Sequence, residues 1–234
     1  MNDFLYPHVK GYKKIKYFPL YLIIKYRTKK VWVLIDKQIK YFEGFGYCIP
    51  NLPLNSFYKN DTVLFKKDRT IFPSAIFVSS YLGEFINFLK IADSHFNQIK
   101  NFKIYIISKA ITSELKKKYN NERYVWLSNV KDVSEYYSKA WISIIPGYKR
   151  DGPLIKFIES IYYDTPVVCT DVSINGYECF NVEKELIPTD NDVPAFIVKM
   201  NKILNEDLDL IGQELKKIAM NKFSFKAILE QDCY

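Results

Sequence analysis

The sequence lacks the features that mark several classes of protein. Its four cysteines are scattered and show no CxxC spacing, which argues against a disulfide framework or a zinc site and fits a reducing compartment. The longest apolar run, Phe18 to Ile24, is too short to cross a bilayer. The first residues lack the apolar core and cleavage site of a signal peptide. We therefore expect a cytoplasmic protein.

The sequence also gives little indication of a catalytic histidine or of a metal site. The two histidines, His8 and His95, lie far apart in the sequence and have no acid or nucleophile pattern around them. The segments 190–192 (DND) and 207–209 (DLD) match a D-x-D metal signature in form. Both precede predicted helices, however, where an aspartate caps free backbone N–H groups. We expect no metal site.

The chain carries a formal net charge of +8, from 34 Lys and Arg against 26 Asp and Glu. This excess could reflect attraction to nucleic acid or anionic lipid, a pocket for a phosphorylated substrate, or a bias of composition. No nucleic-acid-binding motif is present, so we expect no nucleic acid partner. Lysines alternate with aromatic residues over 10–30, a segment that could hold the protein peripherally on the anionic inner face of the membrane.

Short apolar runs alternate with helical patterns from about residue 70, which predicts βαβ units and a parallel sheet covered on both faces. The expected strands are 75–80, 102–108, 124–128, 141–146 and 166–170, and the expected helices are 83–100, 112–120, 132 onward, 153–163, 193–205 and 208–222. Asp132 and Glu135 have the spacing of a capping box. The fold class is thus α/β, a Rossmann-like doubly wound parallel sheet.

The first 60 residues differ from the rest. They predict a strand at 30–36, a short helix at 37–44 and a strand at 47–50, followed by a linker. This is too little for a full domain. We therefore divide the chain into a short N-terminal α/β remnant, residues 1–60, and a Rossmann-like domain, residues 61–234.

The most informative stretch is 144–171, IIPGYKRDGPLIKFIESIYYDTPVVCTD. A strand ends at Pro146, and Pro153 starts a helix, where its fixed φ is favourable. The loop between them lies at the C-terminal end of a strand, where open parallel sheets bind ligands. The free N–H groups of Leu154 and Ile155 and the helix dipole favour an anion there.

Charged side chains surround this loop. Lys149, Arg150 and Lys156 add positive charge, so a diphosphate would suit the site. Asp151 and Glu159 are eight residues apart, and both can face the same cleft. Because a carboxylate can accept two hydroxyl hydrogen bonds at once, the pair could hold ribose or sugar diols. The alternative is a solvated loop and a solvated helix face.

The stretch DGPLIKFIESIYYDTPVV resembles the E-G-x-G-x-P-x-x-E-A-x-A-x-G-x-P-V-V segment of retaining glycosyltransferases of the two-Rossmann (GT-B) fold. Three other segments, NVKDVSEYYSKAWISIIP, FVSSYLGEFINFLKIA and IPNLPLNSF, are similar to further parts of that family in the same order. The likeness covers roughly residues 30–225. It implies a domain that binds a nucleotide-diphospho-sugar as donor substrate, with no metal and no other cofactor.

The resemblance also implies roles for single residues. The counterpart of Glu159 binds the ribose, and the counterpart of Asp151 lies against the donor sugar, which makes Asp151 the candidate catalytic residue. The candidate donor-binding residues are Ser80, Lys149, Arg150, Gly152, Pro153, Leu154, Lys156 and Glu159.

The sequence departs from the family in three places. The family carries an Arg after the first strand of the donor domain and a Lys about five residues later, and these positions hold Ser80 and Phe85 here. The first carboxylate is Asp151 rather than a glutamate. The family has an N-terminal acceptor domain of a size similar to the donor domain, and we expect only its last strand, helix and strand in this sequence, in residues 15–50.

Two functions are compatible with this pattern. The first is a glycosyltransferase that moves a sugar to a glycan, lipid-linked or protein acceptor, as in the synthesis of a surface polysaccharide. The alternative is a non-catalytic nucleotide-sugar-binding subunit, which needs a partner chain that supplies the acceptor domain.

Overall fold

The computed structural model describes residues 67–147, 154–174, 177, 180 and 193–223, together with the backbone of 30–33 and 47–50. The two early segments form a parallel pair of strands, β1 (Lys30–Val33) and β2 (Tyr47–Pro50). Both strands fall where the sequence predicts them. The division at residue 60 and the helix at 37–44 lie outside what the structure describes and remain predictions.

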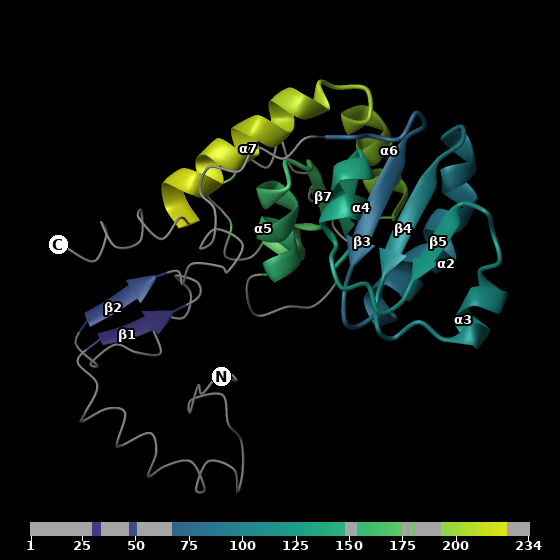
Figure 1. The fold of residues 1–234 in the computed structure, drawn as a ribbon, viewed down its shortest axis with the longest axis horizontal. Coiled ribbons are helices and arrows are strands. Elements are labelled where there is room, and N and C mark those ends of the chain that lie inside the picture. The colour runs from purple at the N-terminus through teal and green to yellow at the C-terminus, as the bar shows by residue number, and fades with distance from the viewer. Residues whose placement is uncertain are drawn as a thin grey trace, which may run out of the picture.

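The main body is a five-stranded sheet in the order β5-β4-β3-β6-β7, and every pair of neighbours is parallel (Figure 1). The strands are β3 (Ser74–Val78), β4 (Lys103–Ile107), β5 (Tyr124–Leu127), β6 (Ile142–Ile145) and β7 (Val167–Cys169). The helices are α2 (Gly83–His95), α3 (Ser113–Lys118), α4 (Ser134–Lys139), α5 (Ile155–Tyr162), α6 (Val193–Ile203) and α7 (Leu208–Phe223), with 3-10 turns η4 (Phe96–Gln98) and η5 (Asp171–Ile174). This order confirms the predicted doubly wound sheet.

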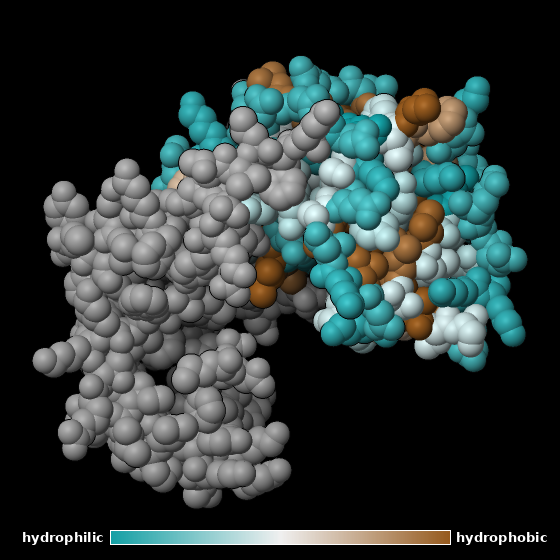
Figure 2. Space-filling view, in the orientation of Figure 1, coloured by the Kyte–Doolittle hydropathy of each residue, from teal (hydrophilic) through white to brown (hydrophobic). Residues whose placement is uncertain are grey.

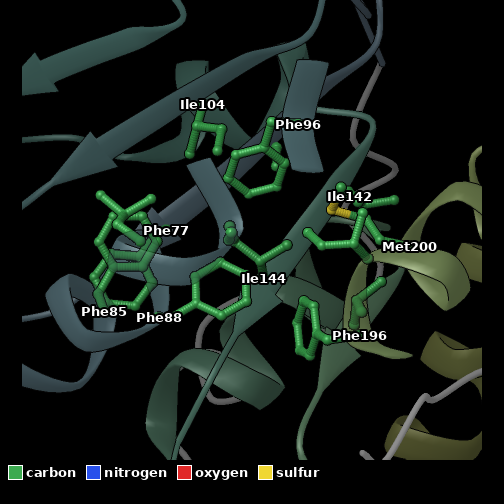
Figure 3. Packing of buried hydrophobic residues seen from close by; sticks show 14 of the residues in the cluster. Phe77, Phe85, Phe88, Phe96, Ile104, Ile142, Ile144, Phe196 and Met200 are labelled. Atoms are coloured by element: carbon green, nitrogen blue, oxygen red, sulfur yellow. The ribbon is translucent and has the colours of Figure 1, made fainter. Parts of the chain in front are cut away.

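Side chains alternate between two apolar layers, as the twofold repeat of a strand requires. Ala75 and Phe77 of β3 face the layer built with α2 and α6, whereas Ile76 faces the layer that holds α4. Helix α5 packs on the ends of β6 and β7, with α7 against its outer side. Figures 1 and 3 show the sheet between these layers and the aromatic packing of the α2–α6 side.

The turn between α5 and β7 is fixed by its contact with α7. Asp164 adopts a left-handed backbone with φ 53°, at the position where the family segment has a glycine. Its carboxylate pairs with Lys216 at 3.0 Å. A Cβ on Gly212 would lie 2.5 Å from the Asp164 carbonyl oxygen, so the close approach of α7 requires glycine at 212.

One local prediction is wrong. Asp132 accepts a hydrogen bond from the Ser134 backbone N–H at 2.8 Å, but Glu135 pairs with Lys139 instead of closing a capping box. Helix α4 begins at Ser134, two residues after Asp132, so the glutamate is one position too early to reach back.

The described residues on the face that Figure 2 shows are mainly hydrophilic, with some apolar areas between them. The exposed large apolar side chains include Ile71, Ile91 and Val198. Scattered residues of this kind are usual on soluble domains. No helix among the described residues is both long and apolar enough to cross a membrane.

Candidate functional site

The sheet has its topological switch point between β3 and β6. The chain leaves β3 toward α2 and β4 on one side and leaves β6 toward α5 and β7 on the other. Ligands of open α/β sheets bind in the crevice beyond the C-terminal strand ends at such a point. Two segments flank it, which we call the β3 wall (residues 77–85) and the α5 wall (residues 145–147 and 154–159).

The α5 wall presents two ionisable side chains on one helical face. Lys156 and Glu159 are three residues apart, so their side chains project from the same side of α5. The Lys156 ammonium lies 4.6 Å from the centroid of the Phe77 ring, at the end of β3. Lys156 therefore reaches across the switch point, and a cation–π contact helps to hold it there.

Glu159 is a half-buried carboxyl group whose partner comes from α4. The Tyr137 hydroxyl donates to Glu159 Oε2 at a distance of 3.4 Å. Burial raises the pKa of Glu159 above its ordinary value, and the Tyr137 hydrogen bond opposes that rise. The interaction with Tyr137 thus favours the ionised form, which is the form that accepts hydrogen bonds from hydroxyl groups.

Hydroxyl groups fix the point at which the chain leaves β6. The Gly147 N–H donates to Ser173 Oγ at 3.1 Å, and the Thr170 hydroxyl donates to the Gly147 carbonyl. Ser173 also donates to the Ile145 carbonyl at 3.0 Å. The 3-10 turn η5 thereby positions the start of the loop that leads to α5.

The end of that loop is fixed as firmly. The Tyr177 hydroxyl donates to the Leu154 carbonyl at 3.1 Å, and its ring stacks on Phe157 with centroids 4.6 Å apart. Leu154 is the N-cap of α5 and offers no side-chain acceptor to the first-turn amides. A helix start with that arrangement favours a bound anion.

The β3 wall is apolar by comparison (Figure 3). Phe85 is fully buried and stacks on Phe77, with centroids 4.0 Å apart and ring planes 15° apart. Ser80 is exposed in the turn between β3 and α2, and the first turn of α2 carries Glu84. The two positions at which the family segment places cations therefore hold a hydroxyl group and a core aromatic ring.

The structure brings together some of the predicted site residues. Leu154, Lys156 and Glu159 share the first two turns of α5, and Ser80 stands on the opposite wall. The loop residues Lys149, Arg150, Asp151, Gly152 and Pro153 lie outside the described residues, so their roles stay predictions.

The two D-x-D matches have different outcomes. Asp207 Oδ1 accepts hydrogen bonds from the N–H groups of Asp209 and Leu210, at 3.1 and 3.0 Å, which confirms a capping role at the start of α7. The match at 190–192 falls outside the described part of the chain. Within that part, no group of three His, Cys, Asp or Glu side chains is arranged to hold a metal ion.

The family profile described as "Glycosyl transferases group 1" matches residues 74–206, which is more than half of the 234-residue chain and includes both walls of the crevice. The chain belongs to the group 1 glycosyl transferases. Its five-stranded parallel domain has the Rossmann-like fold of the GT-B class. No curated protein sequence matches this glycosyl transferase significantly.

Solved structures of glycosyltransferases have the same fold. Staphylococcus aureus TarM, in a complex with UDP, matches with a TM-score of 0.70 at 15% identity, over 92% of this chain and 45% of TarM. Anabaena HepE, in complex with UDP and glucose, matches with a TM-score of 0.68 at 14% identity, over 100% of this chain and 69% of HepE. Pneumococcal GtfA, in complex with UDP and GlcNAc, matches with a TM-score of 0.66 at 17% identity, over 93% of this chain and 46% of GtfA. The chain thus spans less than half the length of TarM and GtfA.

The sequence did not identify four residues that contribute to the site. All four are polar residues whose side chains hydrogen-bond to residues of the α5 wall. They are Tyr137, Thr170, Ser173 and Tyr177. Tyr137 alone had a signal, because it lies in the segment NVKDVSEYYSKAWISIIP, which resembles the family. The other three act through contacts between segments that are far apart in the sequence.

Proposed function

We propose that this group 1 glycosyl transferase moves a sugar from a nucleotide-diphospho-sugar to a glycan, lipid-linked or protein acceptor, with retention of configuration. The observation that carries the proposal is the placement of Lys156 and Glu159 on one face of α5 at the switch point of the sheet. TarM, HepE and GtfA, which share the fold, were crystallised with UDP.

Each group on the α5 wall has a task in this proposal. The Glu159 carboxylate accepts hydrogen bonds from the ribose hydroxyls, and the first-turn amides of α5 face the diphosphate. Lys156 supplies positive charge to the same diphosphate. These groups need no metal ion, because amides and an ammonium group together offset the phosphate charge.

The chemical step breaks the bond between the anomeric carbon of the sugar and the diphosphate oxygen. The leaving diphosphate gains negative charge as that bond lengthens, and the α5 amides and Lys156 stabilise this charge more in the transition state than in the ground state. The acceptor hydroxyl oxygen forms the new bond to the anomeric carbon, and its proton passes to the diphosphate oxygen that leaves. Asp151, next to the donor sugar by resemblance, is the candidate for a catalytic carboxylate.

A second function is a candidate because the β3 wall has no basic side chain at positions 80 and 85. A nucleotide-sugar-binding subunit would need a partner chain that supplies the acceptor site. A structure described as the GtfA/B complex shares the fold, with a TM-score of 0.66. Such a subunit would bind the donor alone but transfer sugar only with its partner.

Calorimetric titration of the wild type with UDP, GDP, CDP and their sugars tests the donor site. One base should bind saturably, and Glu159→Gln should weaken that binding. Loss of hydrogen bonds to a charged group costs about 1.5–3 kcal/mol, or roughly 10- to 150-fold in affinity.

Glu214→Gln is the matched control, because Glu214 is an exposed glutamate on α7, outside the crevice. It should bind the nucleotide like the wild type. Absence of binding by every nucleotide, or an equal loss in both variants, would contradict the proposed donor site.

A further inference from the structure

Tyr137 is a buried phenol whose ring is held from several sides. Its side chain is fully buried and stacks on Tyr163, with centroids 4.9 Å apart and ring planes 13° apart. Its backbone carbonyl accepts a hydrogen bond from Lys67 Nζ at 3.0 Å and one from the Thr165 hydroxyl at 3.3 Å. A ring and a backbone fixed in this way leave the phenol oxygen little freedom of position.

That fixed oxygen lies next to Glu159 of the α5 wall. The hydroxyl donates to Glu159 Oε2 at 3.4 Å, and the two residues come from different helices, α4 and α5. A burial as complete as that of Tyr137 requires a hydrogen-bond partner for the hydroxyl group. Glu159 accepts this hydrogen bond, and the Ser160 side chain also hydrogen-bonds the phenol oxygen.

We propose that Tyr137 is the positioning residue of the donor site, which orients the Glu159 carboxylate toward the ribose and keeps it ionised through the phenol hydrogen bond. The inference rests on the proposed function for the role of Glu159. Tyr137 itself does not touch the nucleotide, because its side chain has no exposed surface.

The electrostatics agree with this geometry. Among the described residues, the titratable groups that interact with Glu159 are two phenols, Tyr137 and Tyr163. Burial raises the pKa of Glu159, and among the described residues the hydrogen bond from Tyr137 opposes that rise. Burial, followed by the charge on Glu159, raises the pKa of Tyr137 far above its ordinary value, so this phenol stays a donor at every pH of interest.

The test is Tyr137→Phe, which keeps the stacked ring and removes only the hydroxyl group. Tyr136→Phe is the control, because Tyr136 is half-buried on the same helix and packs beside Tyr105 instead of Glu159. The first readout is the carboxyl pKa of Glu159. It is measured from the ¹³C resonance of the Glu159 carboxyl group as the pH is varied, in the full chain without ligand. We expect this pKa to rise in Tyr137→Phe, because the hydrogen bond that lowers it is lost, and to stay unchanged in Tyr136→Phe.

The second readout is the affinity for the nucleoside diphosphate that the wild type binds. Tyr137→Phe should weaken binding about 3- to 10-fold at neutral pH, less than Glu159→Gln, because the carboxylate that binds the ligand is kept and loses only its orientation. The loss should grow as the pH falls, because the carboxyl group of the variant takes up its proton at a higher pH. An affinity and a pH profile equal to those of Tyr136→Phe would overturn the inference.

Failure of the inference can be told from failure of the proposed function. If the wild type binds no nucleotide, the donor site fails, but the ligand-free titration of Glu159 still judges the role of Tyr137. If the wild type binds and Glu159→Gln does not, while Tyr137→Phe matches its control, only the inference fails. A further test uses the wild type alone. The NMR resonance of the buried Tyr137 hydroxyl proton should change its chemical shift as Glu159 titrates. A chemical shift that stays constant over the titration would contradict the proposal.

Discussion

The two walls of the crevice differ in the kind of residue that builds them. The β3 wall is a stack of phenyl rings, Phe77 on Phe85, followed by an exposed Ser80. The α5 wall carries Lys156 and Glu159. A Rossmann-like domain can draw its phosphate-binding charge from either side of the switch point. In this chain the described charge comes from the helix after β6, and the β3 side gives support by packing.

The walls also differ in what lies beneath them. Aromatic residues of α2 and α6 support the β3 wall, whereas polar groups lie behind the α5 wall, including Lys67, Tyr137 and Thr165. An apolar support is insensitive to pH. A support that contains a buried amine is sensitive to pH, because burial lowers the pKa of the amine in the folded state. The stability of the domain should therefore depend on pH through the α5 side.

The largest expected effect concerns Lys67. Burial, with help from Arg69, lowers the pKa of Lys67 from 10.5 to about 7. Between pH 7 and 9 the unfolded chain keeps this proton and the folded chain has lost it, so the free energy of unfolding should rise with pH. The slope approaches about 1.4 kcal/mol per pH unit, which gives about 2 kcal/mol over the interval.

Urea unfolding at several pH values measures this slope. Lys67→Met should lack the Lys67 contribution, whereas Lys217→Met, at an exposed position of α7, should unfold with the slope of the wild type. A wild type and a Lys67→Met variant with the same pH dependence would show that Lys67 keeps an ordinary pKa.

The next effect sharpens the difference in charge between the walls. Lys156→Met keeps a long side chain over the Phe77 ring and removes the ammonium group. Nucleoside diphosphate affinity should fall about 10-fold, because an interaction with a charged group is lost. Binding of the nucleoside without phosphates should not change. Calorimetry with both ligands distinguishes these outcomes, and an equal loss for both would assign Lys156 a structural role.

The smallest expected effect comes from adding a positive charge to the β3 wall, which would reduce the difference in charge between the two walls. Ser80→Arg places a cation where the similar family segment has one, at an exposed position with no core contact to lose. Diphosphate affinity should rise about 2- to 5-fold at low salt and less at high salt, as screening predicts. Ser80→Gln adds length without charge and should leave the affinity unchanged. A gain that is the same for both variants would show that charge is not the cause.

Much of the fold could be predicted from the sequence, because its signals are local. Nearly unbroken apolar runs such as 141–146 mark central strands, and the strand β6 (Ile142–Ile145) lies within that run. The predicted helix 83–100 is α2 followed by the 3-10 turn Phe96–Gln98. Phe96 is still a core residue there, so the apolar spacing continues beyond the end of the α-helix.

The site could be predicted only in part. Lys156 and Glu159 were accessible because they lie within one continuous motif. The partner of Glu159 was not, because Tyr137 precedes it by 22 residues and reaches it only after α4 and α5 pack on the same side of the sheet. The position of Lys156 over Phe77 likewise depends on the crossover between β3 and β6. Contacts of this kind follow from tertiary structure and have no local sequence pattern.

The most direct test of the central claim is a ¹H–¹⁵N NMR titration of the full chain with the nucleoside diphosphate that binds best. The claim predicts that amide shifts concentrate on the α5 wall, at 145–147 and 154–159, and spare residues 97–103, which lead into the amino-terminal end of β4. Shifts that concentrate at residues 97–103, or a spectrum that does not change at saturating ligand, would contradict the account.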